Sequence, residues 1–425
     1  MTVLLERPAP ALAPAPAPVA VAGRDVFVDA LRLFGMALVI LQHWSMPVLS
    51  FADGRIVTGN ALAAPGVFAV TWISQVMPLV FFAGGAANAI GLRARGGAYL
   101  EAGPVWLAQR LRRLAWPVLA LGAVWVPLPH ALLALGLPEQ PVEVGARLTG
   151  QLLWFLAAYL IAVALSPVLL RAHERYGARV PAVLAAGAVA VDLLRFGTGL
   201  EWLGYLNVAC VWLAVHQIGF LYADGRITRP LLLVAGGYGA ALLLVAAGPY
   251  PGSMIGLPGA PVSNMAPPTL ALLAVGIGQI GLALLLRPLI VRARWLRPAL
   301  GWAGPRIMTA YLWHMPALVA VAGVVVVGLG VSTPEPGGAA WAALWPLWLG
   351  LLGLVLWPLL RGLARFERPP AVPYGPLGWP GALAAAALVG AGLLTLTVAG
   401  FAPGLAPVAG MLAIGAGLLL TVPRL

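Results

Sequence analysis

Residues 32–43 read RLFGMALVILQH, an apolar run with an arginine at its start and a histidine at its end. On an α-helix, a separation of eleven residues is close to three full turns, so Arg32 and His43 fall on one face, roughly 16 Å apart along the axis. Charged and ionisable side chains are costly inside a bilayer and are usually kept there for a function. The pair is therefore predicted to line a functional site within a membrane.

The composition is that of a chain that crosses a membrane many times. Of its 425 residues, 61% are hydrophobic and only 9% are charged, and the mean hydropathy is +0.95, which excludes an ordinary soluble domain. The net charge of +12 comes from arginines, without a lysine. These arginines lie mostly between apolar runs, where they set topology, so they do not indicate a nucleic-acid partner. The single cysteine, Cys210, excludes an intramolecular disulfide and a metal site built on thiolates, and no metal is expected.

The apolar runs predict an all-α, polytopic transmembrane helical bundle. A helix needs about 20 apolar residues to cross a bilayer, and about twelve runs are long enough. We expect a core of ten helices, followed by about two accessory C-terminal helices that are rich in glycine and alanine. The runs lie at 26–49, 67–91, 112–134, 151–170, 180–194, 202–222, 230–247, 269–287, 307–330, 340–360, 380–399 and 404–422.

The arginines also predict an orientation. If the N-terminus is cytoplasmic, 22 of the 25 arginines fall in cytoplasmic segments, as the positive-inside rule requires. Only Arg55, Arg147 and Arg195 fall outside. We therefore expect an integral plasma-membrane protein with a cytoplasmic N-terminus, whose Ala/Pro-rich residues 1–23 form a disordered tail.

Two groups of side chains are candidates for chemistry. Asp29 lies three residues before Arg32, so the two can pair on one helix face, while His43 further along that face would serve as a base. The alternative is an interfacial ion pair with a structural histidine. Arg110 and Arg113 form an RxxR pair with Arg112 beside them.

Guanidinium groups bind phosphate bidentately, so the RxxR segment is a candidate clamp for a cytosolic phosphorylated cofactor. The alternative is a simple topology signal. His314, in MTAYLWHMPAL, and Trp154, in LLWFLAAYL, are possible supporting residues. Their alternatives are an interhelical hydrogen bond for the histidine and an interfacial aromatic belt for the tryptophan. The sequence holds no Walker A, GxSxG or HExxH motif.

Together these motifs resemble those of the acyltransferase-3 family. Its members are integral membrane O-acyltransferases that depend on acyl-CoA. Arg32 and His43 fit the family's arginine-ten-histidine motif, and Arg110 and Arg113 fit its RxxR motif. Further matches are FFAGG at 81–85, LLWFL at 152–156 and YLWHMP at 311–316. One departure is Ala83, where the family usually has a serine before its glycine. The resemblance assigns an acyltransferase-3 transmembrane domain to residues 24–365, with a linker and the accessory helices in residues 366–425.

The resemblance implies that His43 is the catalytic base and that Arg32, Arg110 and Arg113 serve the acyl-CoA donor. The expected reaction moves an acyl group, most often acetyl, from cytoplasmic acyl-CoA to a hydroxyl of an extracytoplasmic glycan, glycolipid or lipid-linked acceptor. Transfer would be direct or would pass through an acyl-histidine intermediate. The alternatives are a transporter or flippase of a small polar or lipid-linked solute, and a non-catalytic membrane scaffold.

Overall fold

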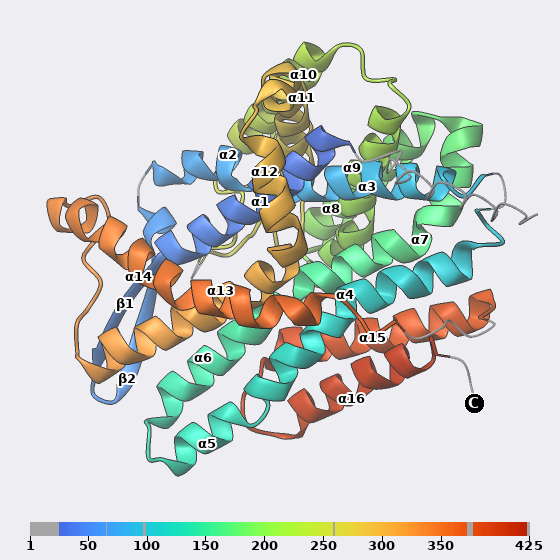
Figure 1. Cartoon of the computed structure of the whole chain (residues 1–425). Coiled ribbons are helices and arrows are strands. Elements are labelled where there is room, and N and C mark those ends of the chain that lie inside the picture. The colour runs from blue at the N-terminus through green and yellow to red at the C-terminus, as the bar shows by residue number, and fades with distance from the viewer. Residues whose placement is uncertain (1–24, 65, 97–98, 258–259, 372–376, 423–425) are drawn as a thin grey trace, which may run out of the picture.

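The computed structural model describes residues 25–422, apart from 65, 97–98, 258–259 and 372–376, so the predicted tail at 1–23 lies outside the described residues. The described chain is a bundle of helices with one small sheet (Figure 1). Eleven of its helical segments are long and apolar enough to cross a membrane, which confirms the predicted polytopic bundle. The last predicted run forms a shorter helix, α16, of 15 residues.

The α-helices follow one another along the chain as numbered in Figure 1. Their bounds are α1 Val26–Ser45, α2 Thr71–Ser74, α3 Met77–Arg93, α4 Gly103–Trp125, α5 Leu128–Ala134, α6 Glu139–Gln151, α7 Trp154–Tyr176, α8 Arg179–Thr198, α9 Asn207–Ala223, α10 Pro230–Ala247, α11 Leu270–Arg292, α12 Leu296–Ala303, α13 Ile307–Ala322, α14 Ala339–Leu363, α15 Trp379–Ala399 and α16 Leu405–Leu419.

The first apolar run departs from the prediction at its end. Helix α1 ends at Ser45, and residues 47–49, which we predicted to be helical, begin a β-hairpin of β1 (Pro47–Ala52) and β2 (Arg55–Asn60). Pro47 has no N–H to extend the helical hydrogen bonds. The two strands pair antiparallel around a turn at Asp53 and Gly54, both with positive φ, a sequence that favours a tight hairpin.

The spanning helices place their arginine-rich ends on one side of the bundle. At the start of α1, the hydroxyl of Tyr222 at the end of α9 donates a hydrogen bond to Asp25 at 2.7 Å. At the end of α3, Arg93 pairs with Asp224 at 2.6 Å. We call this end the arginine side, and the end that carries the β-hairpin the opposite side. The predicted cytoplasmic location of the arginine side stays a prediction.

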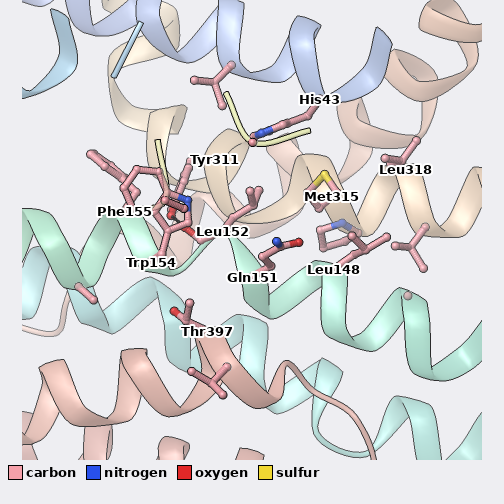
Figure 2. A pocket seen from close by; sticks show the side chains of 18 of the residues that line it. His43, Leu148, Gln151, Leu152, Trp154, Phe155, Tyr311, Met315, Leu318 and Thr397 are labelled. Carbon is pink, nitrogen blue, oxygen red and sulfur yellow. Dashed lines mark hydrogen bonds between the residues drawn. The ribbon is translucent and has the colours of Figure 1, made fainter. Parts of the chain in front are cut away.

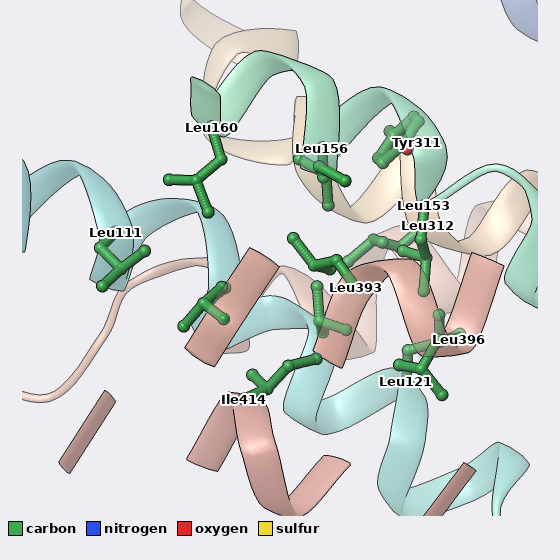
Figure 3. Packing of buried hydrophobic residues seen from close by; sticks show 14 of the residues in the cluster. Leu111, Leu121, Leu153, Leu156, Leu160, Tyr311, Leu312, Leu393, Leu396 and Ile414 are labelled. Carbon is green, nitrogen blue, oxygen red and sulfur yellow. The ribbon is translucent and has the colours of Figure 1, made fainter. Parts of the chain in front are cut away.

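The C-terminal helices pack into the bundle and do not stand apart from it. α15 and α16 lie against α4 (Figure 1). One hydrophobic core joins these helices (Figure 3). It contains Leu111 of α4, Leu156 of α7, Leu393 of α15 and Ile414 of α16. These side chains are all less than about 3% exposed. The helices predicted to be accessory therefore form part of the same hydrophobic core as the helices that carry the candidate site.

Candidate functional site

The site is organised around two histidines that come from distant parts of the chain. Nδ1 of His43, on α1, lies 3.0 Å from Nε2 of His314, on α13, and the two rings are nearly parallel, at 10°. The indole N–H of Trp44 donates a hydrogen bond to the backbone carbonyl of His314 at 2.9 Å. This bond joins α1 to α13 beside the two imidazoles and fixes the position of the two helices along each other.

The hydrogen bonds decide which ring nitrogens carry protons when both imidazoles are neutral. Nδ1 of His314 lies 2.7 Å from the carbonyl oxygen of Tyr311 and 3.2 Å from that of Ala310. Carbonyl oxygens only accept, so this nitrogen carries the proton and Nε2 of His314 is an acceptor. Nδ1 of His43 must then be the donor across the pair. Nε2 of His43 is left with its lone pair available, as a general base requires.

His43 lines a large cavity of about 1790 Å³. Its walls come from α1, α6, α7, α13 and α15, and most of its lining side chains are apolar. In Figure 2, His43 hangs from α1 into this space and Gln151, at the end of α6, faces it from the other wall. Gln151 lines the cavity opposite His43, and the sequence did not single it out.

Aromatic residues form the wall beside the histidines. Trp154 and Phe155, at the start of α7, and Tyr311 of α13 all line the cavity (Figure 2). The hydroxyl of Tyr311 donates to the carbonyl oxygen of Leu152 at 2.5 Å, which fastens α13 to the start of α7. Trp154 thus lies where a bound molecule would touch it, as its predicted supporting role requires, although that role stays a prediction.

The stripe of α1 that contains His43 continues toward the arginine side. Met36, Val39, His43 and Met46 line the cavity, and their spacing of three or four residues places them on one helix face. Arg32 lies one turn before Met36 on that face. Its side chain is 46% exposed and lies 4.0 Å from Asp29. The predicted alignment of Arg32 with His43 is therefore present, with Arg32 below the cavity.

Arg32 joins the RxxR pair in a cluster of positive charge. Arg95 and Arg113 also lie within electrostatic range of Arg110, together with Arg32. The half-buried guanidinium of Arg110 lies against α3, where a Cβ added at Gly91 would be 3.1 Å from its Nη2 atom. Guanidinium groups repel one another, so such a cluster favours the binding of an anion. The structure brings together three of the predicted donor-binding residues.

Arg112 has different surroundings. Its side chain is 5% exposed, its Nε donates to the hydroxyl of Thr421 at 2.8 Å, and its Nη2 donates to the Thr421 carbonyl oxygen at 3.2 Å. These bonds join α4 to the segment just after α16. They explain the burial of Arg112 by helix packing, and its predicted support of the donor stays a prediction.

The glycines of FFAGG allow α3 to approach two neighbouring elements. A Cβ at Gly84 would overlap the ring of Tyr159 on α7, and one at Gly85 would overlap the backbone carbonyl of His216 on α9. Small residues permit such close packing of transmembrane helices. The motif thus holds α3, and with it the wall near Arg110, close to α7 and α9.

Among the described residues, no group of three or more histidine, cysteine, aspartate or glutamate side chains is placed to hold a metal ion. The site consists of an imidazole at an apolar cavity and a separate cluster of guanidinium groups on the arginine side.

The half-buried imidazole of His43 thus lines a cavity within a bundle whose helices are long enough to span a membrane. The family model described as an acyltransferase domain matches residues 25–360. The chain therefore belongs to the acyltransferase-3 family, as its motifs predicted, and is a membrane acyltransferase. Comparisons with curated proteins and with solved structures gave no match.

Proposed function

We propose that the protein is an O-acyltransferase that moves an acyl group, acetyl in the simplest case, from acyl-CoA to a hydroxyl of an acceptor on the opposite side. The arginine side would be cytoplasmic, in line with the positive-inside rule. The observation that supports the proposal is His43, whose Nδ1 contacts His314 and which lines the cavity, together with the cluster of Arg32, Arg110 and Arg113.

In the proposed reaction, the phosphates of acyl-CoA bind the arginine cluster and the thioester extends along the stripe of α1 toward His43. The acceptor hydroxyl gives its proton to Nε2 of His43 while its oxygen forms a bond to the thioester carbonyl carbon. The carbon–sulfur bond then breaks, and the CoA thiolate takes the proton from His43. His314 acts as a positioning residue, because it accepts the Nδ1–H of His43 and keeps Nε2 free.

The experiment measures release of the CoA thiol by purified protein, together with the thermal shift that CoA causes. His43→Ala should lower turnover by at least about a hundredfold, since general-base catalysis contributes about 10²–10⁴, and should leave the CoA-induced shift intact. A transporter or a scaffold would release no thiol in either form. Near-normal turnover in His43→Ala would refute the role of base.

The donor site is tested by changing Arg110 and Arg113 to alanine together. Each lost charge-assisted contact costs about 1.5–3 kcal/mol, so the KM for acyl-CoA should rise at least tenfold and the thermal shift should vanish. Arg297→Ala is the matched control, because this arginine is also exposed on the arginine side. Equal KM values for the pair and the control would show that Arg110 and Arg113 only set topology.

A further inference from the structure

One wall of the cavity comes from outside the segment that matches the family. The match ends at residue 360, whereas α15 begins at Trp379. One face of α15 nevertheless lines the cavity along almost its whole length, about 22 Å by helical rise. The lining residues of α15 are Leu383, Ala386, Ala387, Gly390, Ala391, Leu394, Thr397 and Val398.

Apolar side chains that line the cavity are partly exposed on two spanning helices. Leu383 and Leu394 of α15 are 47% and 55% exposed, and Ile161 and Leu165 of α7 are 42% and 39% exposed. Both helices belong to segments long and apolar enough to cross a membrane. Their exposed apolar side chains border hydrocarbon there, which favours entry of a molecule from the bilayer.

The wall that α15 contributes is apolar apart from one residue, Thr397. His43, Gln151 and Thr397 line the cavity from three different helices (Figure 2). From Thr397, the α15 stripe continues through Leu394 to Leu383 with aliphatic residues and glycine only. The volume of about 1790 Å³ exceeds the roughly 300–1,000 Å³ of common small-molecule sites. An acetyl group and a small hydrophilic acceptor would leave most of this apolar space empty.

We propose that α15 makes this enzyme select acceptors that carry a hydrocarbon tail. The tail lies between α7 and α15, and the hydroxyl at its polar end meets Nε2 of His43. The acceptor is thus a lipid or a lipid-linked hydroxyl compound taken from the bilayer, not a soluble glycan. This inference rests on the proposed acyl transfer and names the class of its acceptor.

The test uses acetyl-CoA with methyl, hexyl and octyl β-glucoside as acceptors, each below its micelle concentration. A fully buried methylene raises affinity roughly fourfold, so kcat/KM should rise at least tenfold from methyl to octyl. Ala391→Trp fills the part of the cavity between α7 and α15, which we call the groove, and should reduce this gain to less than threefold. Ala384→Trp is the control, because Ala384 is exposed on α15 but does not line the cavity.

A second experiment asks whether the groove holds the hydrocarbon tail of the acceptor or the acyl chain of the donor. If Ala391→Trp impairs palmitoyl-CoA relative to acetyl-CoA and leaves the glucoside series unchanged, the groove holds the donor's acyl chain and the proposal is overturned. A flat glucoside series in the wild type overturns it as well.

A third measurement does not depend on activity. Octyl glucoside that bears a diazirine in its tail should label α7 and α15 in the wild type and in Ala384→Trp, but not in Ala391→Trp. Equal labelling of all three overturns the tail site. If the wild type releases no CoA thiol with any acceptor, the proposed function fails, and the labelling still decides whether the groove binds hydrocarbon.

Discussion

Replacing His314 with alanine removes the acceptor for the Nδ1–H of His43, 3.0 Å away. A hydrogen bond between neutral groups contributes about 0.5–1.5 kcal/mol, which corresponds to about a 2- to 13-fold change in rate. Loss of the base itself costs about 10²–10⁴-fold. We therefore expect kcat to fall up to roughly tenfold in His314→Ala and at least a hundredfold in His43→Ala. The KM for acyl-CoA should stay unchanged, because the arginine cluster is intact.

The assay is a double-mutant cycle on acyl transfer, at equal amounts of folded protein. If His314 acts only through His43, the double variant is no slower than His43→Ala alone. His314→Gln should recover part of the lost rate, because an amide oxygen can accept the same hydrogen bond. Rate losses that multiply in the double variant would refute a positioning role, as would a His314→Ala protein that loses thermal stability but keeps its full kcat.

Two further predictions concern Arg32 and Gly85. Arg32→Lys keeps the charge but loses the planar fork of the guanidinium, so the variant should insert normally and transfer acyl groups poorly. Asp29→Asn should lower acyl transfer only slightly. A simple ion pair predicts the reverse order of the two activities, measured at matched membrane abundance. Gly85→Ala places a Cβ onto the carbonyl of His216 and should destabilise the protein by about 1–3 kcal/mol in thermal unfolding. The control Gly236→Ala, which has open space around it, should not destabilise the protein; a Gly85→Ala protein as stable as this control would disprove the close contact.

The arrangement of the spans followed from the sequence because length, hydropathy and arginine placement are local properties. The hairpin did not follow, since the apolar VLSFA of β1 extends the run of α1, and short apolar runs do not separate helix from strand by periodicity. The signals were present in Pro47 and in the Asp53–Gly54 pair, which favour a break and a tight turn.

The relative placement of two site residues followed from geometry where they share one helix. Arg32 and His43 align through helical geometry alone, and α1 places them as expected. The contact between His43 and His314 joins residues 271 positions apart, and no pattern within either helix says that α1 and α13 touch. Gln151 ends α6 directly before the LLWFL match, and nothing in that motif indicated that the preceding amide lines the cavity.

The bonds between Arg112 and Thr421 tie the two ends of the chain's helical bundle together. The buried guanidinium of α4 donates to the hydroxyl and to the carbonyl oxygen of Thr421, and the apolar faces of α15 and α16 share one core with α4. A chain shortened ahead of α15 would lose both bonds and leave the core side chains of α4 without their partners. The C-terminal helices are therefore required for the packing of the helix that carries Arg110 and Arg113.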